Sequence, residues 1–200
     1  MGTEDKRIIR EWLNGSSGFF YTAGKTLYAG KTRYQSIELV ETEEFGNTLL
    51  LDGITQVVRK NDYQYHEPMV HPAMLAHPDP RNVLVIGGGD GGILREVLRY
   101  RSVEGVDFAE LDEEVVEFSR RHLPEISGGA FDDPRVAFRF QDGRAFVESR
   151  QGVYDVVIMD MTDPQGPSRM LYTAEFFRAV RRSLRDPRGL FVMHAESPIT

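Results

Sequence analysis

The segment that most constrains the fold reads as a buried strand, a glycine turn and a helix start. Residues 83–86 are Val-Leu-Val-Ile, residues 87–92 are Gly-Gly-Gly-Asp-Gly-Gly, and Ile93–Arg99 has the composition of a helix. Glycine lets the backbone adopt positive φ and approach a ligand closely, and a helix N-terminus ordinarily attracts an anion. Asp90 lies inside the turn and opposes an anion. The turn therefore favours a ligand that offers an ammonium or a ribose hydroxyl, such as a positively charged nucleoside.

Strand and helix patterns alternate from about residue 81 onward. The expected strands are Val83–Ile86, Val106–Leu111, Val136–Phe140, Asp155–Asp160 and Leu190–His194, and the expected helices begin near Gly92, Glu113, Gly143 and Thr173. This alternation predicts an α/β fold with a doubly wound, mostly parallel sheet. Right-handed crossovers bring the carboxyl ends of such strands to one edge, where ligands bind. Acidic residues follow several of these strand ends, at Asp90, Glu110, Asp142 and Asp160–Asp163.

Residues from about Phe19 to Arg59 have the alternating pattern of a small antiparallel sheet. Alternating apolar residues predict strands at Tyr34–Glu41, Thr48–Leu51 and Ile54–Val58, with a tight hairpin turn at Asp52-Gly53. Residues 62–76 have helical apolar spacing, and the prolines that follow end that helix. We therefore expect a β-strand domain at 1–61, a linking helix at 62–80 and a nucleoside-binding catalytic domain at 81–200.

Composition excludes several classes of function. The formal net charge of −7 argues against a broad surface for nucleic acid or anionic membrane, and it is compatible with cationic small molecules. Cysteine is absent, which excludes disulfides, thiolate catalysis and cysteine-based metal sites. Met1–Arg10 is charged and no apolar core follows it, so we expect no signal peptide, no membrane span and a cytoplasmic location.

Glu110 ends the second strand of the α/β region, roughly 20 residues beyond the glycine turn, where nucleoside-binding folds place a ribose-binding acid. A carboxylate there can accept hydrogen bonds from both ribose hydroxyls. The alternative is an acid that only caps the helix starting near Glu113, and Asp112 is a candidate for that cap. Spacing and strand-end position favour the ribose role for Glu110.

Asp142-Gly143 follows the next strand along the chain. Its carboxylate and backbone amide are suited to the amino group and ring nitrogen of adenine. Taken alone, Asp142 is more often only an N-cap, here for a helix at Arg144–Ser149. The argument for Asp142 as a ligand-binding residue depends on the other acids that follow neighbouring strands.

The strand that ends at Asp160 continues into a loop rich in proline and glycine, which carries a second acid at Asp163. A loop of this composition is rigid enough to hold charges for chemistry. The alternative is a structural turn in which Asp163 accepts from backbone donors before Pro164. Two acids together, beside Asp90, favour the chemical role.

The five histidines predict no metal site. They are His66, His71, His77, His122 and His194, and they contain neither an i, i+4 pair nor the HExxH spacing of zinc and iron sites. The chain also lacks a nucleophile elbow, a P-loop and a catalytic cysteine. Tyr65-His66-Glu67 lies near the start of the predicted linking helix, and a single histidine there is ordinarily a structural residue.

Together, these motifs resemble one known family, the polyamine aminopropyltransferases, and spermidine synthases most closely. The matching motifs are Tyr34-Gln35, Leu51-Asp52-Gly53 with Gln56, Tyr65-His66-Glu67, Gly87–Gly92 with Arg95-Glu96, Glu110-Leu111-Asp112, Asp132–Arg135 with Asp142-Gly143, and Asp160–Pro167. They extend over nearly the whole chain, and the last one distinguishes the family from ordinary methyltransferases. The resemblance implies a small N-terminal antiparallel sheet, then a Rossmann-like (class I methyltransferase-like) sheet, in a homo-oligomer that is a dimer or a tetramer.

The resemblance also implies a transferase of polyamine biosynthesis. It would move an aminopropyl group from decarboxylated S-adenosylmethionine, a co-substrate, to putrescine, giving spermidine and 5′-methylthioadenosine without any cofactor or metal. By similarity, Asp160 is the base for the attacking amine. By similarity again, Gln35, Asp90, Glu110, Asp142, Gly143 and Pro167 hold the donor, and Tyr65, His66, Asp90 and Asp163 hold the diamine and product.

The chemistry of the donor agrees with the acids seen in the sequence. Decarboxylated S-adenosylmethionine is a sulfonium with a terminal ammonium and no carboxylate, so Asp90 would accept it and repel ordinary S-adenosylmethionine. A protonated amine has no lone pair, so Asp160 would have to take or relay one proton and align the nitrogen for in-line displacement.

The sequence departs from its relatives in two respects. Asn61-Asp62 stands where relatives usually have Asp-Glu, and Gln64 occupies a usually apolar position, which leaves the acceptor open among putrescine, agmatine, cadaverine and longer polyamines. Relatives also extend beyond the position of Thr200, so we expect the last strands of the family's sheet to be absent. Two other functions stay open: a methyltransferase on the same sheet, and a truncated, inactive nucleoside-binding or interaction module.

Overall fold

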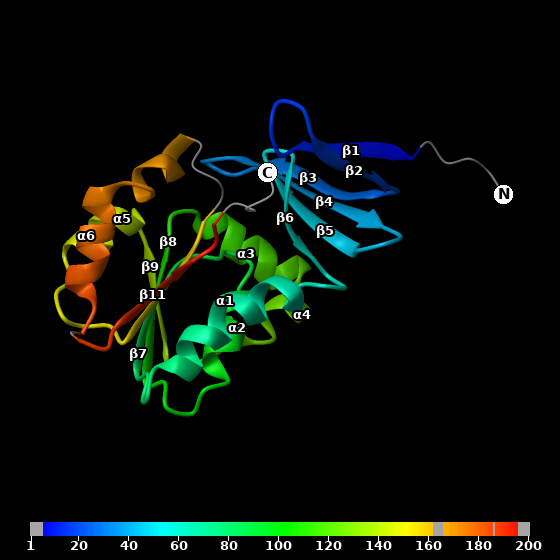
Figure 1. Ribbon diagram of the computed structural model, residues 1–200. Coiled ribbons are helices and arrows are strands. Elements are labelled where there is room, and N and C mark those ends of the chain that lie inside the picture. The colour runs from blue at the N-terminus through cyan, green and yellow to red at the C-terminus, as the bar shows by residue number, and fades with distance from the viewer. Residues whose placement is uncertain (1–5, 162–165, 186, 196–200) are drawn as a thin grey trace. The chain divides into compact units, whose positions relative to one another are not determined.

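The computed structural model describes residues 6–161, 166–185 and 187–195 (Figure 1). Its described residues form two compact units. The β-sheet unit includes residues 6–62 and Ala195, and the Rossmann-like unit is Tyr63–His194. Helix α1 (Tyr63–Ala76) belongs to the Rossmann-like unit. Within the described ranges, no helix combines the length and the apolar character that crossing a membrane requires.

The β-sheet unit contains two antiparallel sheets. One pairs β1 (Arg7–Trp12) with β2 (Gly18–Ala23), and the other holds β3 (Thr26–Lys31), β4 (Ser36–Thr42), β5 (Gly46–Leu51) and β6 (Ile54–Val58) in that order. Asp52 and Gly53 connect β5 to β6 with φ angles of 49° and 80°. Two consecutive positive φ angles are typical of the tight hairpin turn that an Asp-Gly pair predicts. The small antiparallel sheet expected from the sequence is confirmed.

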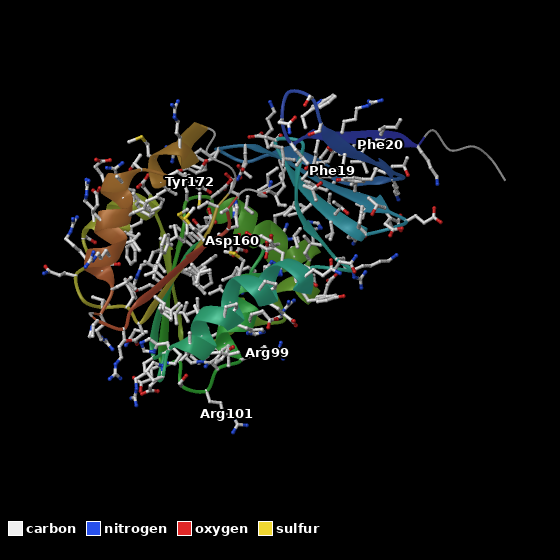
Figure 2. The ribbon with its side chains drawn as sticks, in the orientation of Figure 1. Phe19, Phe20, Arg99, Arg101, Asp160 and Tyr172 are labelled. Carbon is white, nitrogen blue, oxygen red and sulfur yellow. The ribbon has the colours of Figure 1, made fainter. Side chains whose placement is uncertain are left out.

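The β1–β2 hairpin has one buried side and one apolar exposed side. Ile9 of β1 is buried together with Val40 and Leu50 of the larger sheet. On the exposed side, Trp12 and Phe20 are 73% and 72% exposed, and Phe20 is labelled in Figure 2. The register places both residues on one face of the hairpin, and large exposed apolar areas mark interaction surfaces.

Five parallel strands form the sheet of the Rossmann-like unit. They are β7 (Asn82–Gly87), β8 (Gly105–Glu110), β9 (Val136–Phe140), β10 (Val156–Asp160) and β11 (Leu190–Met193), and their order is β11-β10-β7-β8-β9. The first strand, β7, is therefore central. The chain builds outward through β8 and β9 before it returns to β10 on the other side of β7. Ligands bind at such a reversal in open α/β sheets, so the boundary between β7 and β10 is the expected site.

Helices cover both faces of this sheet (Figure 1). In β7, Val83 and Val85 pack with α1 and with α2 (Gly92–Leu98). Leu84 and Ile86 face the opposite way and pack with α5 (Gly143–Glu148) and α6 (Ala174–Ser183). A strand buried on both faces has a continuous apolar sequence, which explains the Val-Leu-Val-Ile run. The predicted doubly wound sheet is confirmed.

The remaining helices agree less closely with the predictions made from the sequence. Helix α3 (Glu113–His122) begins where predicted, and Asp112 caps it by accepting a hydrogen bond from the Glu114 N–H at 3.2 Å. Three short elements were not predicted: α4 (Pro124–Ser127), η1 (Ala130–Asp132) and η2 (Gly166–Leu171). Segments this short do not contain enough residues for helical apolar periodicity to appear.

Candidate active site

The glycine turn brings the backbone against Asp160, which ends β10 and pairs in register with Gly87 (Figure 2). Gly87 and Gly88 have φ angles of 77° and 76°, which side chains disfavour. A Cβ atom on Gly87 would lie 2.1 Å from the Asp160 carbonyl oxygen, and one on Gly88 would lie 2.9 Å from Asp160 Oδ2. These two glycines are therefore required for the turn to approach the carboxylate closely.

Asp90 is held in the same turn by two partners. Its Oδ1 accepts a hydrogen bond from the Gly92 N–H at 2.7 Å and lies 3.4 Å from His66 Nε2. Burial by itself would raise the pKa of Asp90, but His66, the Gly92 N–H and Arg95 outweigh it, so the pKa lies below its ordinary value. Asp90 is thus ionised and available to an ammonium group.

His66 is 1% exposed, and its ring packs on the backbone at the start of α2. A Cβ atom on Gly92 would lie 2.1 Å from His66 Cε1. In this structure His66 contacts Asp90 of the glycine turn through Nε2. Its predicted contact with the diamine stays a prediction, and its observed contact is with the acid.

Asp160 is the acid whose surroundings raise its pKa toward neutral pH. Tyr65 Oη donates to Asp160 Oδ1 at 2.5 Å. Burial and the nearby negative charge of Asp90 raise the pKa of Asp160 to about 6, against the opposing effects of Tyr65, His66 and His194. A carboxyl group with this pKa is ionised at neutral pH and can take up a proton at little cost, as a general base requires.

Tyr65 joins Asp160 to a residue that the sequence analysis did not assign to the site. Its Oη lies 3.2 Å from His194 Nδ1, and the two rings have centroids 6.3 Å apart. Burial and the negative charge of Asp160 raise the pKa of Tyr65 above its usual range, so it stays a phenol. His194 directly follows β11, and a position after a strand end was the signal that could have identified it.

Glu110 lies at the carboxyl end of β8, beside the glycine turn. A Cβ atom on Gly89 would lie 3.4 Å from Glu110 Oε2, and Oε1 accepts from the Asp112 N–H at 2.9 Å. Burial raises the pKa of Glu110 to about 7, with smaller contributions from the charges of Asp112 and Asp160. Because Asp112 caps α3, Glu110 is not needed as that cap. Its predicted role at the ribose stays a prediction.

Asp142 is exposed, and its Oδ1 accepts from the Ala145 N–H at 2.8 Å, so the N-cap alternative is observed. A Cβ atom on Gly143 would lie 2.7 Å from Ile86 Cγ2, so this glycine lets α5 pack closely on β7. A cap uses one carboxylate oxygen, and binding of adenine by this pair stays a prediction.

Of the three remaining predicted site residues, the structure describes Gln35 and Pro167. Gln35 belongs to the β-sheet unit, where its backbone N–H donates to Thr32 Oγ1 at 3.2 Å. Pro167 lies in η2, and Asp163 lies outside the described residues. Their binding roles stay predictions.

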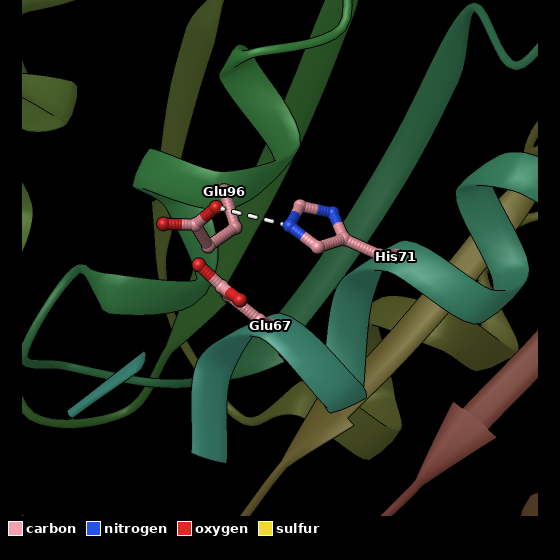
Figure 3. A group of neighbouring side chains, drawn as sticks. All are labelled: Glu67, His71 and Glu96. Atoms are coloured by element: carbon pink, nitrogen blue, oxygen red, sulfur yellow. Dashed lines mark ion pairs between the residues drawn. The ribbon is translucent and has the colours of Figure 1, made fainter. Parts of the chain in front are cut away.

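A second cluster of polar side chains lies between α1 and α2, where the metal-ligating atoms of Glu67, His71 and Glu96 are all within 4.8 Å of one another (Figure 3). The histidine spacings considered in the sequence could not reveal it, because two of its members are carboxylates. Arg95 Nε lies 2.9 Å from Glu96 Oε1, and Arg99 Nη1 lies 2.7 Å from Oε2. With both oxygens bound to guanidinium groups, we interpret the cluster as an ion-pair network that joins the two helices.

Comparison with known proteins agrees with this geometry. A model of the spermine/spermidine synthase domain matches residues 62–200, and a model of the spermidine synthase tetramerisation domain matches residues 9–58. The chain is 45% identical over 97% of its length to the polyamine aminopropyltransferase of Thermococcus onnurineus, and 46% identical over 88% to polyamine aminopropyltransferase 1 of Aquifex aeolicus. It spans 68% and 62% of the lengths of these two relatives.

Solved structures give the same result. The spermidine synthase from Thermotoga maritima superimposes with a TM-score of 0.89 at 37% identity, covering 99% of this chain and 68% of that one. A spermidine synthase in complex with the transition state analogue AdoDATO gives 0.85 at 37% identity, covering 92% and 64%. With both family models matched and the acids gathered at the switch point of the sheet, the chain belongs to the spermine/spermidine synthase family of polyamine aminopropyltransferases.

Proposed function

We propose that this chain transfers an aminopropyl group from decarboxylated S-adenosylmethionine to putrescine, giving spermidine and 5′-methylthioadenosine. The observation that carries the proposal is the arrangement of Asp90 and Asp160 at the reversal between β7 and β10. One carboxylate is kept ionised and the other has a raised pKa. Two acids with different protonation behaviour suit a reaction that binds one cation and deprotonates another.

The donor would occupy the glycine turn. Ionised Asp90 would bind the terminal ammonium, and Glu110 would accept from the ribose hydroxyls. Asp142, Gly143, Gln35 and Pro167 are proposed, from the family resemblance, to hold the rest of the nucleoside. Decarboxylated S-adenosylmethionine is consumed in the reaction, so it acts as a co-substrate.

The acceptor would lie between Asp160 and Tyr65. Asp160 takes one proton from the ammonium of the diamine, and the freed lone pair attacks the methylene carbon beside the sulfonium. The C–S bond breaks, its electron pair goes to sulfur, and neutral methylthioadenosine leaves while the new secondary amine carries the positive charge. Tyr65 holds Asp160 in place through the 2.5 Å hydrogen bond. Positioning of this kind supplies much of the acceleration in displacement reactions.

We also propose a homo-oligomer, a dimer or a tetramer, that assembles through the β-sheet unit. The match of residues 9–58 to a tetramerisation domain supports it, as do the exposed aromatic side chains of Trp12 and Phe20. Such side chains are enriched where protein surfaces associate. Small molecules are the proposed substrates, and a cytoplasmic location stays a prediction.

A panel of amines tests the proposed reaction. The chain is incubated with decarboxylated S-adenosylmethionine and, separately, putrescine, agmatine, cadaverine or spermidine, and products are identified by mass spectrometry. We expect methylthioadenosine and spermidine, with putrescine giving the highest kcat/KM. Greater activity on another amine would overturn the assignment of putrescine. Binding of methylthioadenosine without turnover of any amine would instead indicate a binding module. A methylated product in a parallel incubation with S-adenosylmethionine would indicate a methyltransferase.

A further inference from the structure

His194 is a titratable residue at the candidate active site that the proposed reaction does not yet use. Strands β10 and β11 pair in register up to Met159 and Met193, so Asp160 and His194 are the next residues along the two neighbouring strands. Tyr65 Oη lies within hydrogen-bond distance of both side chains, 2.5 Å from Asp160 Oδ1 and 3.2 Å from His194 Nδ1. The three side chains form one row, from α1 and from the ends of two adjacent strands.

The geometry points to His194 as a positioning residue that directs the Tyr65 hydroxyl toward Asp160. This inference rests on the proposed function, because it assigns His194 a part in the same reaction.

The inference follows from the number of protons that Tyr65 can share. A phenol has one hydroxyl proton, and in this structure Tyr65 gives it to Asp160. The Tyr65 oxygen can then only accept from His194, which requires the tautomer of His194 with its proton on Nδ1. A donor fixed on that side disfavours rotation of the hydroxyl away from Asp160. His194 therefore acts on the base through Tyr65, without touching the substrate.

The experiment compares two substitutions at His194. His194→Gln keeps a side-chain N–H that can donate to Tyr65, and His194→Leu removes the donor. His122→Gln, at the end of α3 where the ring stacks on Phe118, is the matched control. For each variant, kcat/KM for the diamine is measured at pH 8, and methylthioadenosine affinity verifies that the site has folded.

At pH 8 we expect His194→Gln to lie within about two-fold of the unmodified chain, and His194→Leu to lose about ten-fold or more, the scale of a misoriented catalytic group. His122→Gln should match the unmodified chain. Equal kcat/KM values for His194→Gln and His194→Leu would overturn the inference and leave the proposed function intact. An unmodified chain that turns over no amine would overturn both.

A second readout does not depend on turnover. In ¹⁵N histidine NMR of the unmodified chain at pH 8, His194 should carry its proton on Nδ1, and Tyr65→Phe should abolish that preference. A His194 proton on Nε2, unchanged by Tyr65→Phe, would contradict the hydrogen-bond direction on which the inference depends.

Discussion

Replacing Glu110 with glutamine should stabilise the folded chain at pH 8, although it should weaken nucleoside binding. The pKa of this carboxyl rises from 4.5 to about 7 on folding, mainly because the side chain is buried. Each pH unit of that rise is worth about 1.4 kcal/mol. Glu110 would therefore cost the folded state about 3 kcal/mol above pH 7, and partial exposure to solvent reduces the expected cost to about 1–3 kcal/mol.

The sign of the pH dependence follows from proton binding. Between pH 4.5 and 7 the folded chain holds the Glu110 proton while the unfolded chain has lost it, so stability falls as pH rises through this window. Glutamine cannot ionise, and it retains an oxygen that can accept from the Asp112 N–H. The difference between variant and unmodified chain should thus be absent near pH 4 and fully present above pH 7.

Denaturant unfolding at several pH values measures this difference, with methylthioadenosine calorimetry on the same samples. We expect Glu110→Gln to gain about 1–3 kcal/mol of unfolding free energy at pH 8 and to lose about 1–3 kcal/mol of nucleoside affinity. Glu125→Gln on α4 is a matched control for the loss of one negative charge. A stability difference that is independent of pH would refute the burial argument, and unchanged affinity would refute the ribose role.

Three further predictions concern other parts of the chain. Calorimetry should show decarboxylated S-adenosylmethionine binding more tightly than S-adenosylmethionine, and Asp90→Asn should narrow the gap; equal affinities in the unmodified chain would contradict the charge argument. Gly92→Ala should cost about 1–3 kcal/mol in denaturant unfolding and weaken donor binding, because its Cβ would meet the His66 ring at 2.1 Å; unchanged stability would show that His66 is not held against α2. Replacing Trp12 and Phe20 with serine should reduce the molar mass measured by light scattering, and an unchanged mass would place the oligomer contact elsewhere.

The glycine turn and the acids after the strands could be predicted because they depend on local sequence. Val83–Ile86 is buried on both faces, and that burial is visible as an apolar run. Asp160 and Glu110 follow comparable runs, so their position at one edge of the sheet required only the rule for parallel strands. The Asp52-Gly53 turn is likewise encoded by two adjacent residues.

Contacts that depend on the order of the strands could not be predicted. The sequence does not reveal that β10 lies between β7 and β11, and this order is what places His194 beside Tyr65. His66 contacts Asp90 only because α1 packs against the start of α2. The Glu67–His71–Glu96 cluster depends on the same packing of α1 on α2. In each case the partners are far apart in sequence and share no local pattern.

Asp160 is the residue on which the account depends most directly, so the decisive measurement is the turnover rate of Asp160→Asn with decarboxylated S-adenosylmethionine and putrescine. Asparagine keeps the shape and can still bind Tyr65, but it cannot take a proton. The account predicts that kcat falls by roughly 10²-fold or more, the scale of a lost positioned base, while methylthioadenosine affinity is unchanged. Asp163→Asn, as the comparison, should chiefly raise KM for the diamine. A kcat preserved in Asp160→Asn, with the loss of kcat appearing at Asp163 instead, would contradict the assignment.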